Sequence, residues 1–251
     1  MTSLLDSLPI ESIQRTCVQI AIETTGQSGS IAVLEGEKIH QATVLPPGNR
    51  TAATLAPALN EVLQWCNEHD KHPDFLSVAA GPGSFTGLRI GVTTAKTFCY
   101  AKQLPLVAVD SIAAIAVTAF HDHASVDHLL VGINAYRGQT FAGQFTRNQL
   151  IPALSTASIP DTSDVVSVMD QSQWLARLAA TADQTHLAGE AKCFGDAADT
   201  TRFVTRQSPE AVGVGLLALR MAFANKFCDP LALVPRYLKP SAAEEKHAKA
   251  N

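Results

Sequence analysis

The stretch "VAAGPGSFTGLRIGVTTAKTFCYA", Val78 to Ala101, joins a short apolar run to a longer segment through a glycine-rich turn. The apolar run ends "DFLSVAAG", residues 74–81, and its composition is typical of a buried strand. Residues 86–102 keep a helical pattern of apolar and small residues. The stretch therefore predicts a strand, a tight turn and a helix, which are the components of an α/β fold.

The segments on either side of this stretch extend the same pattern. Two runs that precede it, residues 17–25 and 28–45, predict three consecutive strands, the last two around the Glu35-Gly36-Glu37 turn. Residues 54–69 predict an amphipathic helix that starts just before Pro57, since proline interrupts a helix interior. After the stretch, residues 104–110 predict a strand and residues 111–120 a helix.

The second half of the chain begins a similar plan. Residues 128–150 predict two strands joined near Arg137-Gly138. Further elements follow, namely a helix over 161–181, a short strand over 185–191 and a long helix over 209–226. No repeat is visible at the level of residues, but the order of elements predicts two α/β lobes, residues 17–120 and 121–240, with flexible ends at 1–16 and 241–251.

Composition limits the classes of function. The 251 residues are 46% hydrophobic and only 17% charged, with a net charge of −4, which argues against strong autonomous binding to nucleic acid. No run is apolar and long enough to predict a transmembrane helix, and the first residues lack the features of a signal peptide. The five cysteines form no CxxC motif and predict neither a disulfide framework nor a thiolate zinc site. We expect a cytoplasmic protein with reduced thiols.

The glycine-rich turn matches none of the familiar catalytic loops. Ser84 lacks the flanking glycines of a nucleophile elbow, and Leu88-Arg89 follow Gly87 where a Walker A motif requires Lys-Ser/Thr. Gly81, Gly83 and Gly87 also miss the GxGxxG spacing. Two interpretations remain: the loop only turns the chain into its helix, or its N–H groups and the helix dipole hold an anion.

Small residues recur every four positions along the following helix. Gly87, Gly91, Ala95 and Cys99 therefore lie on one face, which lets another element approach closely. That element is either the chain's own sheet or helix, or a partner protein, and the spacing does not distinguish them.

Five segments resemble the bacterial TsaB (YeaZ) proteins. They are "IAIETTGQSGSIAV", "AAGPGSFTGLRIGVTTAK", "VAVDSI", "INAYRGQTFAGQF" and "VPRYLKP", in this order, between Val18 and Pro240. The resemblance implies a two-lobed actin-like ATPase fold (ASKHA, ribonuclease H-like), in which each lobe is a mixed sheet with flanking helices.

The resemblance also implies a function. TsaB proteins act in the formation of N6-threonylcarbamoyladenosine at position 37 of tRNAs that read ANN codons. They pair with the transferase TsaD, and the ATPase TsaE joins them, so the resemblance implies a non-catalytic scaffold, no catalytic residues and contact with tRNA through the complex. It further implies a heterodimer through the N-terminal lobe and no membrane, and it leaves open a homodimer when the protein is alone. The implied interface residues are Leu55, Leu59, Leu63, Gly87, Gly91, Ala95 and Cys99.

Two observations bear on cofactors. TsaD-type proteins carry a metal-binding histidine pair on a helix, whereas the helix near Thr51 carries no histidine until its far end, so we expect no metal site. The family usually has Asp-Thr-Ser after the first strand, and this chain has Glu23-Thr24-Thr25. We expect no tightly bound cofactor, with an adenine nucleotide at the partner junction left open.

An actin-like ATPase or small-molecule kinase is the alternative hypothesis. It would place a nucleotide among the first-strand residues, the glycine loop and the turn of the second lobe. The candidate contacts are Glu23, Thr24, Gly81, Gly83, Ser84, Thr86, Arg89 and Arg137. Arg236 is a weaker candidate, since a solvent-exposed or lobe-bridging arginine explains it better than a contact with nucleotide does.

Overall fold

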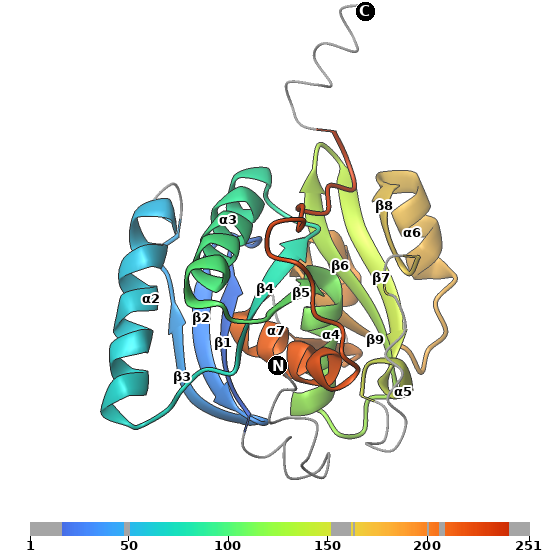
Figure 1. Ribbon diagram of the computed structural model, residues 1–251. Coiled ribbons are helices and arrows are strands. Elements are labelled where there is room, and N and C mark those ends of the chain that lie inside the picture. Colours follow the sequence, from blue (N-terminus) through green and yellow to red (C-terminus); the bar gives the residue numbers. More distant parts are fainter. Residues whose placement is uncertain are drawn as a thin grey trace, which may run out of the picture.

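Two five-stranded sheets of the same topology form the framework of the protein (Figure 1). The computed structural model describes residues 17–47, 51–151, 162, 164–199, 201–205 and 209–240. The first sheet has the order β3-β2-β1-β4-β5. Its strands are β1 (Val18–Glu23), β2 (Ser30–Glu35), β3 (Lys38–Val44), β4 (Phe75–Gly81) and β5 (Leu106–Asp110). The first three strands pair antiparallel, and β1, β4 and β5 run parallel.

The second sheet repeats this arrangement. Its order is β10-β9-β6-β7-β8, with antiparallel pairing of β6, β7 and β8 and parallel pairing of β6, β9 and β10. The strands are β6 (His128–Tyr136), β7 (Gln139–Thr146), β8 (Val166–Asp170), β9 (His186–Gly189) and β10 (Phe203–Thr205). The two mixed sheets with flanking helices confirm the predicted two-lobed α/β fold.

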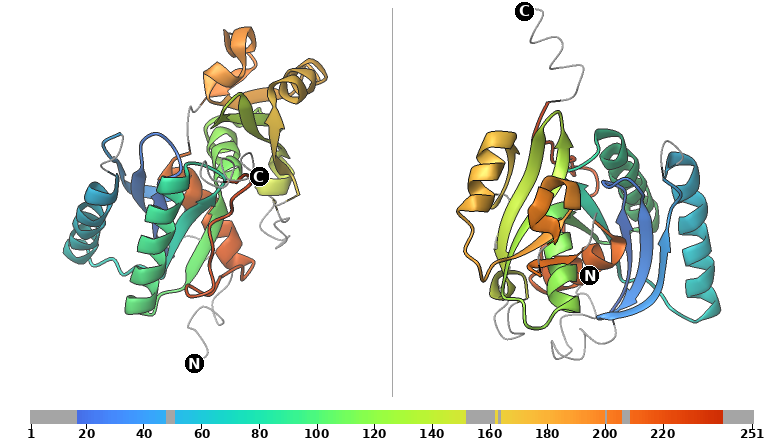
Figure 2. Two further views of the ribbon diagram at one scale, coloured as in Figure 1. Left: turned by 90° about the horizontal axis from the view of Figure 1, so that it is seen from above. Right: turned by 180° about the vertical axis from the view of Figure 1, so that it is seen from behind.

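Helices lie on both faces of each sheet (Figures 1 and 2). Helices α2 (Thr51–Glu68) and α3 (Phe85–Lys102) cover the outer face of the first sheet, while α4 (Ser111–Asp122) and α7 (Ala211–Phe223) lie between the sheets. Helix α6 (Gln171–Ala179) covers the outer side of the second sheet. The short α5 (Arg147–Leu150), η2 (Ala191–Cys193) and η3 (Gly195–Asp199) complete the described elements.

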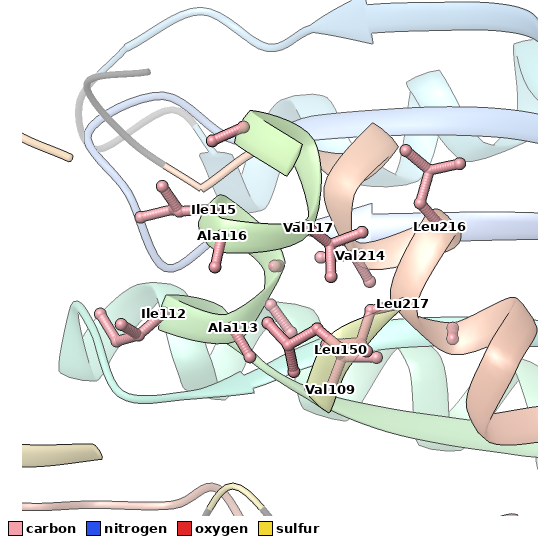
Figure 3. Packing of buried hydrophobic residues seen from close by; sticks show 14 of the residues in the cluster. Val109, Ile112, Ala113, Ile115, Ala116, Val117, Leu150, Val214, Leu216 and Leu217 are labelled. Atoms are coloured by element: carbon pink, nitrogen blue, oxygen red, sulfur yellow. The ribbon is translucent and has the colours of Figure 1, made fainter. Parts of the chain in front are cut away.

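The central core forms where α4 and α7 cross between the sheets (Figure 3). All residues from Ser111 to Phe120 are buried, so α4 is apolar around its whole circumference, as a fully enclosed helix must be. A Cβ on Gly213 of α7 would overlap Thr118 and Ala114 of α4, so the glycine permits close packing of the two helices. Helix α7 follows the second sheet in the sequence but packs on the first, where Gln19 donates a hydrogen bond to its Gly215 carbonyl at 2.9 Å.

Three sequence expectations need comment. The helix predicted over 161–181 is wrong in its first half, because Val166–Asp170 forms a strand that pairs with β7; Asp170 then caps α6. Helix α2 begins at Thr51 and contains Pro57, so its predicted start is also wrong.

The lobe limits at residue 120/121 stay a prediction, and the predicted flexible ends lie outside the described residues. In the described part of the chain, no helix is long and apolar enough to cross a membrane.

Candidate functional site

The small-residue face of α3 packs on the end of β1. A Cβ on Gly87 would overlap the carbonyl oxygen of Thr24, and one on Gly91 would overlap the Thr24 hydroxyl. That hydroxyl donates a hydrogen bond to the Gly87 carbonyl at 2.8 Å. Ala95 and Cys99 continue the contact into the core under α3. The predicted partner interface is wrong for these four residues, because Thr24 covers Gly87 and Gly91, and Ala95 and Cys99 are buried in the core of the first lobe.

The interface predicted on α2 needs the same correction. Leu55 and Leu59 are buried, and the half-buried Leu63 packs against the same core. These leucines face the first sheet, because a helix on the outer face of a sheet directs its apolar stripe inwards. The opposite face of α2 is the one that a partner can reach.

The glycine loop is held between two other parts of the chain. Ser84 donates its backbone N–H to the Thr25 carbonyl at 2.9 Å, and a Cβ on Gly83 would lie 2.5 Å from the Thr25 Cβ. Gly81 has φ +119°, in the region that favours glycine, and its neighbour Ala80 accepts a hydrogen bond from the Arg236 N–H at 2.7 Å. Ser84 also caps α3, since its hydroxyl accepts from the Gly87 N–H. These contacts show that the loop makes a tight packed turn.

Glu23 is the most enclosed carboxyl group of this region, with an exposed fraction of 0%. Its Oε1 atom accepts hydrogen bonds from Thr25 and from the Gly26 N–H, while Oε2 is buried without a hydrogen-bond partner among the described residues. Burial raises the pKa of Glu23 from 4.5 to about 7, although the hydrogen bonds from Thr25 and Gly26 oppose the rise. Glu23 therefore carries a proton more readily than an exposed glutamate.

Replacing Glu23 by glutamine tests this environment. Because the pKa is raised in the folded state, Glu23 makes the protein less stable as pH rises from about 4.5 to about 7. At pH 8 we expect Glu23→Gln to raise the free energy of unfolding by roughly 2 kcal/mol relative to wild type, and the gain to vanish near pH 4. Urea unfolding at both pH values measures this difference. Glu61→Gln, on the exposed face of α2, is the control, and an equal difference at both pH values would contradict the prediction.

A C-terminal strap, residues 228–240, runs back over the first lobe and reaches the second (Figure 1). The Cys228 N–H donates to the Leu106 carbonyl of β5 at 2.9 Å, and Lys96 of α3 donates to the Leu233 carbonyl at 2.7 Å. Arg236 pairs with Asp110 and also donates to the Val166 carbonyl of β8 at 3.2 Å. The strap therefore connects β5, α3 and the second sheet, which confirms the lobe-bridging interpretation of Arg236.

A cavity of about 280 Å³ lies where the strap, the start of α3 and the β6–β7 turn meet. The turn brings Tyr136 and Arg137 to its rim, both with positive φ, +61° and +56°. The strap contributes Arg236, Tyr237 and Lys239. The Tyr237 ring lies 4.7 Å from that of Phe85, which Arg89 covers on another side at 4.2 Å.

The cavity gathers half of the predicted nucleotide contacts. Gly83, Ser84, Thr86 and Arg137 line it. The other four do not: Glu23 and Thr24 are buried under α3, Gly81 lines a neighbouring pocket, and Arg89 lies over the Phe85 ring. Glu23 and Thr24 therefore do not share this cavity with the other four candidates, and the nucleotide contacts stay a prediction.

Sequence reasoning missed most of the strap residues in this cavity. Tyr237 and Lys239 carried no motif, and only the resemblance of "VPRYLKP" marked that part of the chain. Among the described residues, no group of three or more His, Cys, Asp or Glu side chains is placed to hold a metal ion. Burial raises the pKa of the Cys17 and Cys99 thiols to about 12, so both are unreactive thiols at neutral pH.

Comparison with known proteins adds a family to this geometry. A family model described as "TsaD: tRNA N6-adenosine threonylcarbamoyltransferase" matches residues 48–245. The chain belongs to this family. Within the TsaD family, curated relatives similar to this chain carry the name "tRNA threonylcarbamoyladenosine biosynthesis protein TsaB", which confirms the resemblance to TsaB.

Two of these relatives show the extent of the match. The chain is 29% identical over 126 residues to TsaB of Bacillus subtilis, which covers 50% of this chain and 54% of the relative. It is 27% identical over 130 residues to TsaB of Buchnera aphidicola, covering 52% and 58%. The chain thus spans about half the length of the curated relatives it matches.

A solved structure extends the likeness in fold to most of this chain. "YeaZ from Pseudomonas aeruginosa" superimposes with a TM-score of 0.69 at 19% identity and covers 89% of this chain and 100% of that chain. The fold is the two-lobed actin-like, ribonuclease H-like α/β fold that the resemblance implied.

Proposed function

We propose that this protein is a TsaB-type subunit that acts in the biosynthesis of threonylcarbamoyladenosine in tRNA. The observation that carries the proposal is the match to the TsaD family over residues 48–245 together with relatives named TsaB. In this proposal the protein is a non-catalytic scaffold that pairs with a TsaD-type transferase, is joined by a TsaE-type ATPase and meets tRNA through the complex. Pairing with itself when alone and a place in the cytoplasm belong to the same proposal.

The chemistry of the described residues supports a scaffold over a transferase. Helix α2 contains no histidine. TsaD-type proteins, in contrast, carry a metal-binding histidine pair on a helix. The glycine loop is packed against Thr25 and the strap, and Glu23 is enclosed beneath α3. No observation favours the ATPase alternative, and an adenine nucleotide at the partner junction stays a prediction.

The outer face of α2 is the partner surface that we propose. It presents Ala52, Ala53, Ala56 and Pro57 to solvent, and Glu61 is its first charged residue. An exposed apolar face without charge over two helical turns suits close packing against another protein, since interface cores are depleted in charge. Helix α2 is also an outermost layer of the first lobe, so nothing in the described chain covers this face (Figure 1).

Ala56→Arg tests the proposed surface. We expect wild type to form a one-to-one complex with the TsaD protein of the same organism, and the arginine to weaken it about tenfold or more, because a long charged side chain then lies at the centre of the interface. Titration by calorimetry measures the affinity. Ala176→Arg is the matched control, since it introduces the same side chain on the exposed face of α6 in the other lobe.

The possible outcomes test the scaffold function and the proposed partner surface independently. Absence of a complex with wild type would contradict the scaffold function. A complex equally strong with Ala56→Arg would keep the function and exclude the outer face of α2 as its interface.

A further inference from the structure

The C-terminal strap is fixed to the first sheet at two points (Figure 1). At the first, the Cys228 N–H donates to the Leu106 carbonyl of β5 at 2.9 Å. At the second, the Arg236 N–H donates to the Ala80 carbonyl of β4 at 2.7 Å. Between these points Lys96 of α3 donates to two carbonyl oxygens of the strap. Because the strap is held at both points and between them, the space that it encloses against β5 is preformed, which lowers the cost of binding a ligand there.

A cavity of about 430 Å³ lies between the strap and the carboxyl end of β5, and we call it the β5 cavity. Ala108 to Asp110 line it from β5, while Leu233 and Val234 line it from the strap. Arg236 is the one described residue that it shares with the cavity at the start of α3. Its volume falls in the range of roughly 300–1,000 Å³ that is usual for small-molecule sites. The β5 cavity is therefore a second cavity that is large enough for a small ligand.

Most of the wall of the β5 cavity is apolar. Leu217 and Met221 contribute to it from α7, together with Phe227 and Leu233. Val234 also lines the cavity and is 71% exposed, so its apolar surface is in contact with water. Covering such surface is favourable, because removing apolar groups from water lowers the free energy. The β5 cavity therefore suits a ligand with an apolar body.

Asp110 is the only carboxyl group among the described residues that line the β5 cavity, and both of its oxygens have partners. Oδ1 accepts hydrogen bonds from the N–H groups of Ile112 and Ala113, at 2.8 and 2.9 Å. Oδ2 pairs with Arg236 at 2.5 Å. The charges of Asp110 and Arg236 thus compensate each other, and this carboxylate has no need of a cationic ligand.

Lys226 is the remaining charged residue of the described lining. It follows the end of α7, where its N–H donates to the Met221 carbonyl at 2.8 Å, so its backbone is held in place. Lys226 is exposed and forms no ion pair with any described residue. The described lining therefore carries one positive charge without a negative partner, and one such charge favours a monoanion.

We infer that the β5 cavity binds a small monocarboxylate with an unbranched apolar chain, whose carboxylate contacts Lys226 and whose chain packs between α7 and the strap. A phosphate monoester fits less well, because it carries about two negative charges at neutral pH. The inference goes beyond the proposed function, since it stands whether or not the protein pairs with a transferase.

Calorimetric titration of the full-length protein with octanoate, at pH 8 and low ionic strength, is the first test. We expect octanoate to bind about tenfold more tightly than hexanoate, because two further methylene groups leave water. The alcohol 1-octanol has the same chain without the charge, and we expect it to bind about fivefold more weakly than octanoate. Lys226→Gln should remove this preference for octanoate. Lys102→Gln, at the exposed end of α3, is the matched control and should preserve it.

The methionine methyl groups report where the ligand binds. Of the two methionines in the described part of the chain, Met221 lines the β5 cavity, while Met169 packs in the second lobe. In protein labelled at the methionine methyl groups, octanoate should shift the NMR signal of Met221 and leave that of Met169 in place. Met169→Leu removes one signal and so assigns the other.

Each of the following results would overturn the inference. The first two are the absence of saturable octanoate binding at millimolar concentration and equal affinities of wild type for octanoate and 1-octanol. The third is a ligand-induced shift of Met169 without one of Met221. The last is a preference for octanoate that Lys226→Gln leaves unchanged while circular dichroism shows the variant folded.

Discussion

Gly87→Ala should lower the free energy of unfolding by about 3 kcal/mol or more, although alanine is the better helix former. Gly87 lies in the first turn of α3, directly against the carbonyl oxygen of Thr24. A Cβ there would overlap that oxygen, so the helix must move off β1, and the hydrogen bond from Thr24 to the Gly87 carbonyl must lengthen. Urea unfolding followed by circular dichroism measures the loss.

Thr93→Ala is the control for this prediction, because Thr93 is exposed on the same helix and its replacement gains helix propensity without a clash. We expect it to leave stability unchanged or slightly higher. A Gly87→Ala variant as stable as Thr93→Ala would show that α3 does not rest on Thr24 as described. It would also reopen the small-residue face as a partner surface.

The second large effect is expected at the ion pair between Arg236 and Asp110. Arg236→Ala should lower the free energy of unfolding by about 2–3 kcal/mol, because the side chain of Asp110 is only 5% exposed and would lose its cationic partner. The variant also removes the contact of Arg236 with the Val166 carbonyl, so it weakens the connection between the strap and the second sheet. Thermal and urea unfolding both report on the change.

An ion pair on the surface provides the reference for this loss of stability. Arg220→Ala breaks the ion pair with Glu37, which is 55% exposed, and we expect less than about 1 kcal/mol from it. Asp110→Asn keeps an N-cap for α4 while removing the charge, so a double-mutant cycle with Arg236→Ala isolates the pair. A coupling energy near zero in that cycle would contradict the importance of the pair.

The sequence predicts the first sheet and its connections well. Apolar runs such as "CVQIAIETT" and "LPLVAVD" have a composition typical of buried strands, and the structure places a strand within each of them. The second lobe is harder, since residues 161–181 contain a strand and a helix in direct succession. Asp170 ends β8 and caps α6, so one helical pattern conceals both elements.

The site is less accessible to sequence reasoning than the fold. Periodicity places Gly87 and Gly91 on one face of α3, but it does not tell whether β1 or another protein packs there; the position of Thr24 decides this. In the sequence, the glycine-rich turn singles out Ser84, and the turn between two predicted strands singles out Arg137, but nothing indicates that the two residues lie close together. Only the return of the strap brings Lys239 beside them, and residues 228–240 carry no periodic pattern that would predict this path.

The path of the chain also fixes an order of assembly during synthesis. The inner face of the first sheet is covered by α7, and the outer edge of β5 by Cys228, both of which follow the second sheet in the chain. The strands of the first lobe emerge early, yet their core is completed only after the whole second lobe has been translated. Although domains generally fold in the order in which they are synthesised, we expect the first of these two lobes to reach its final stability only after the second has been translated.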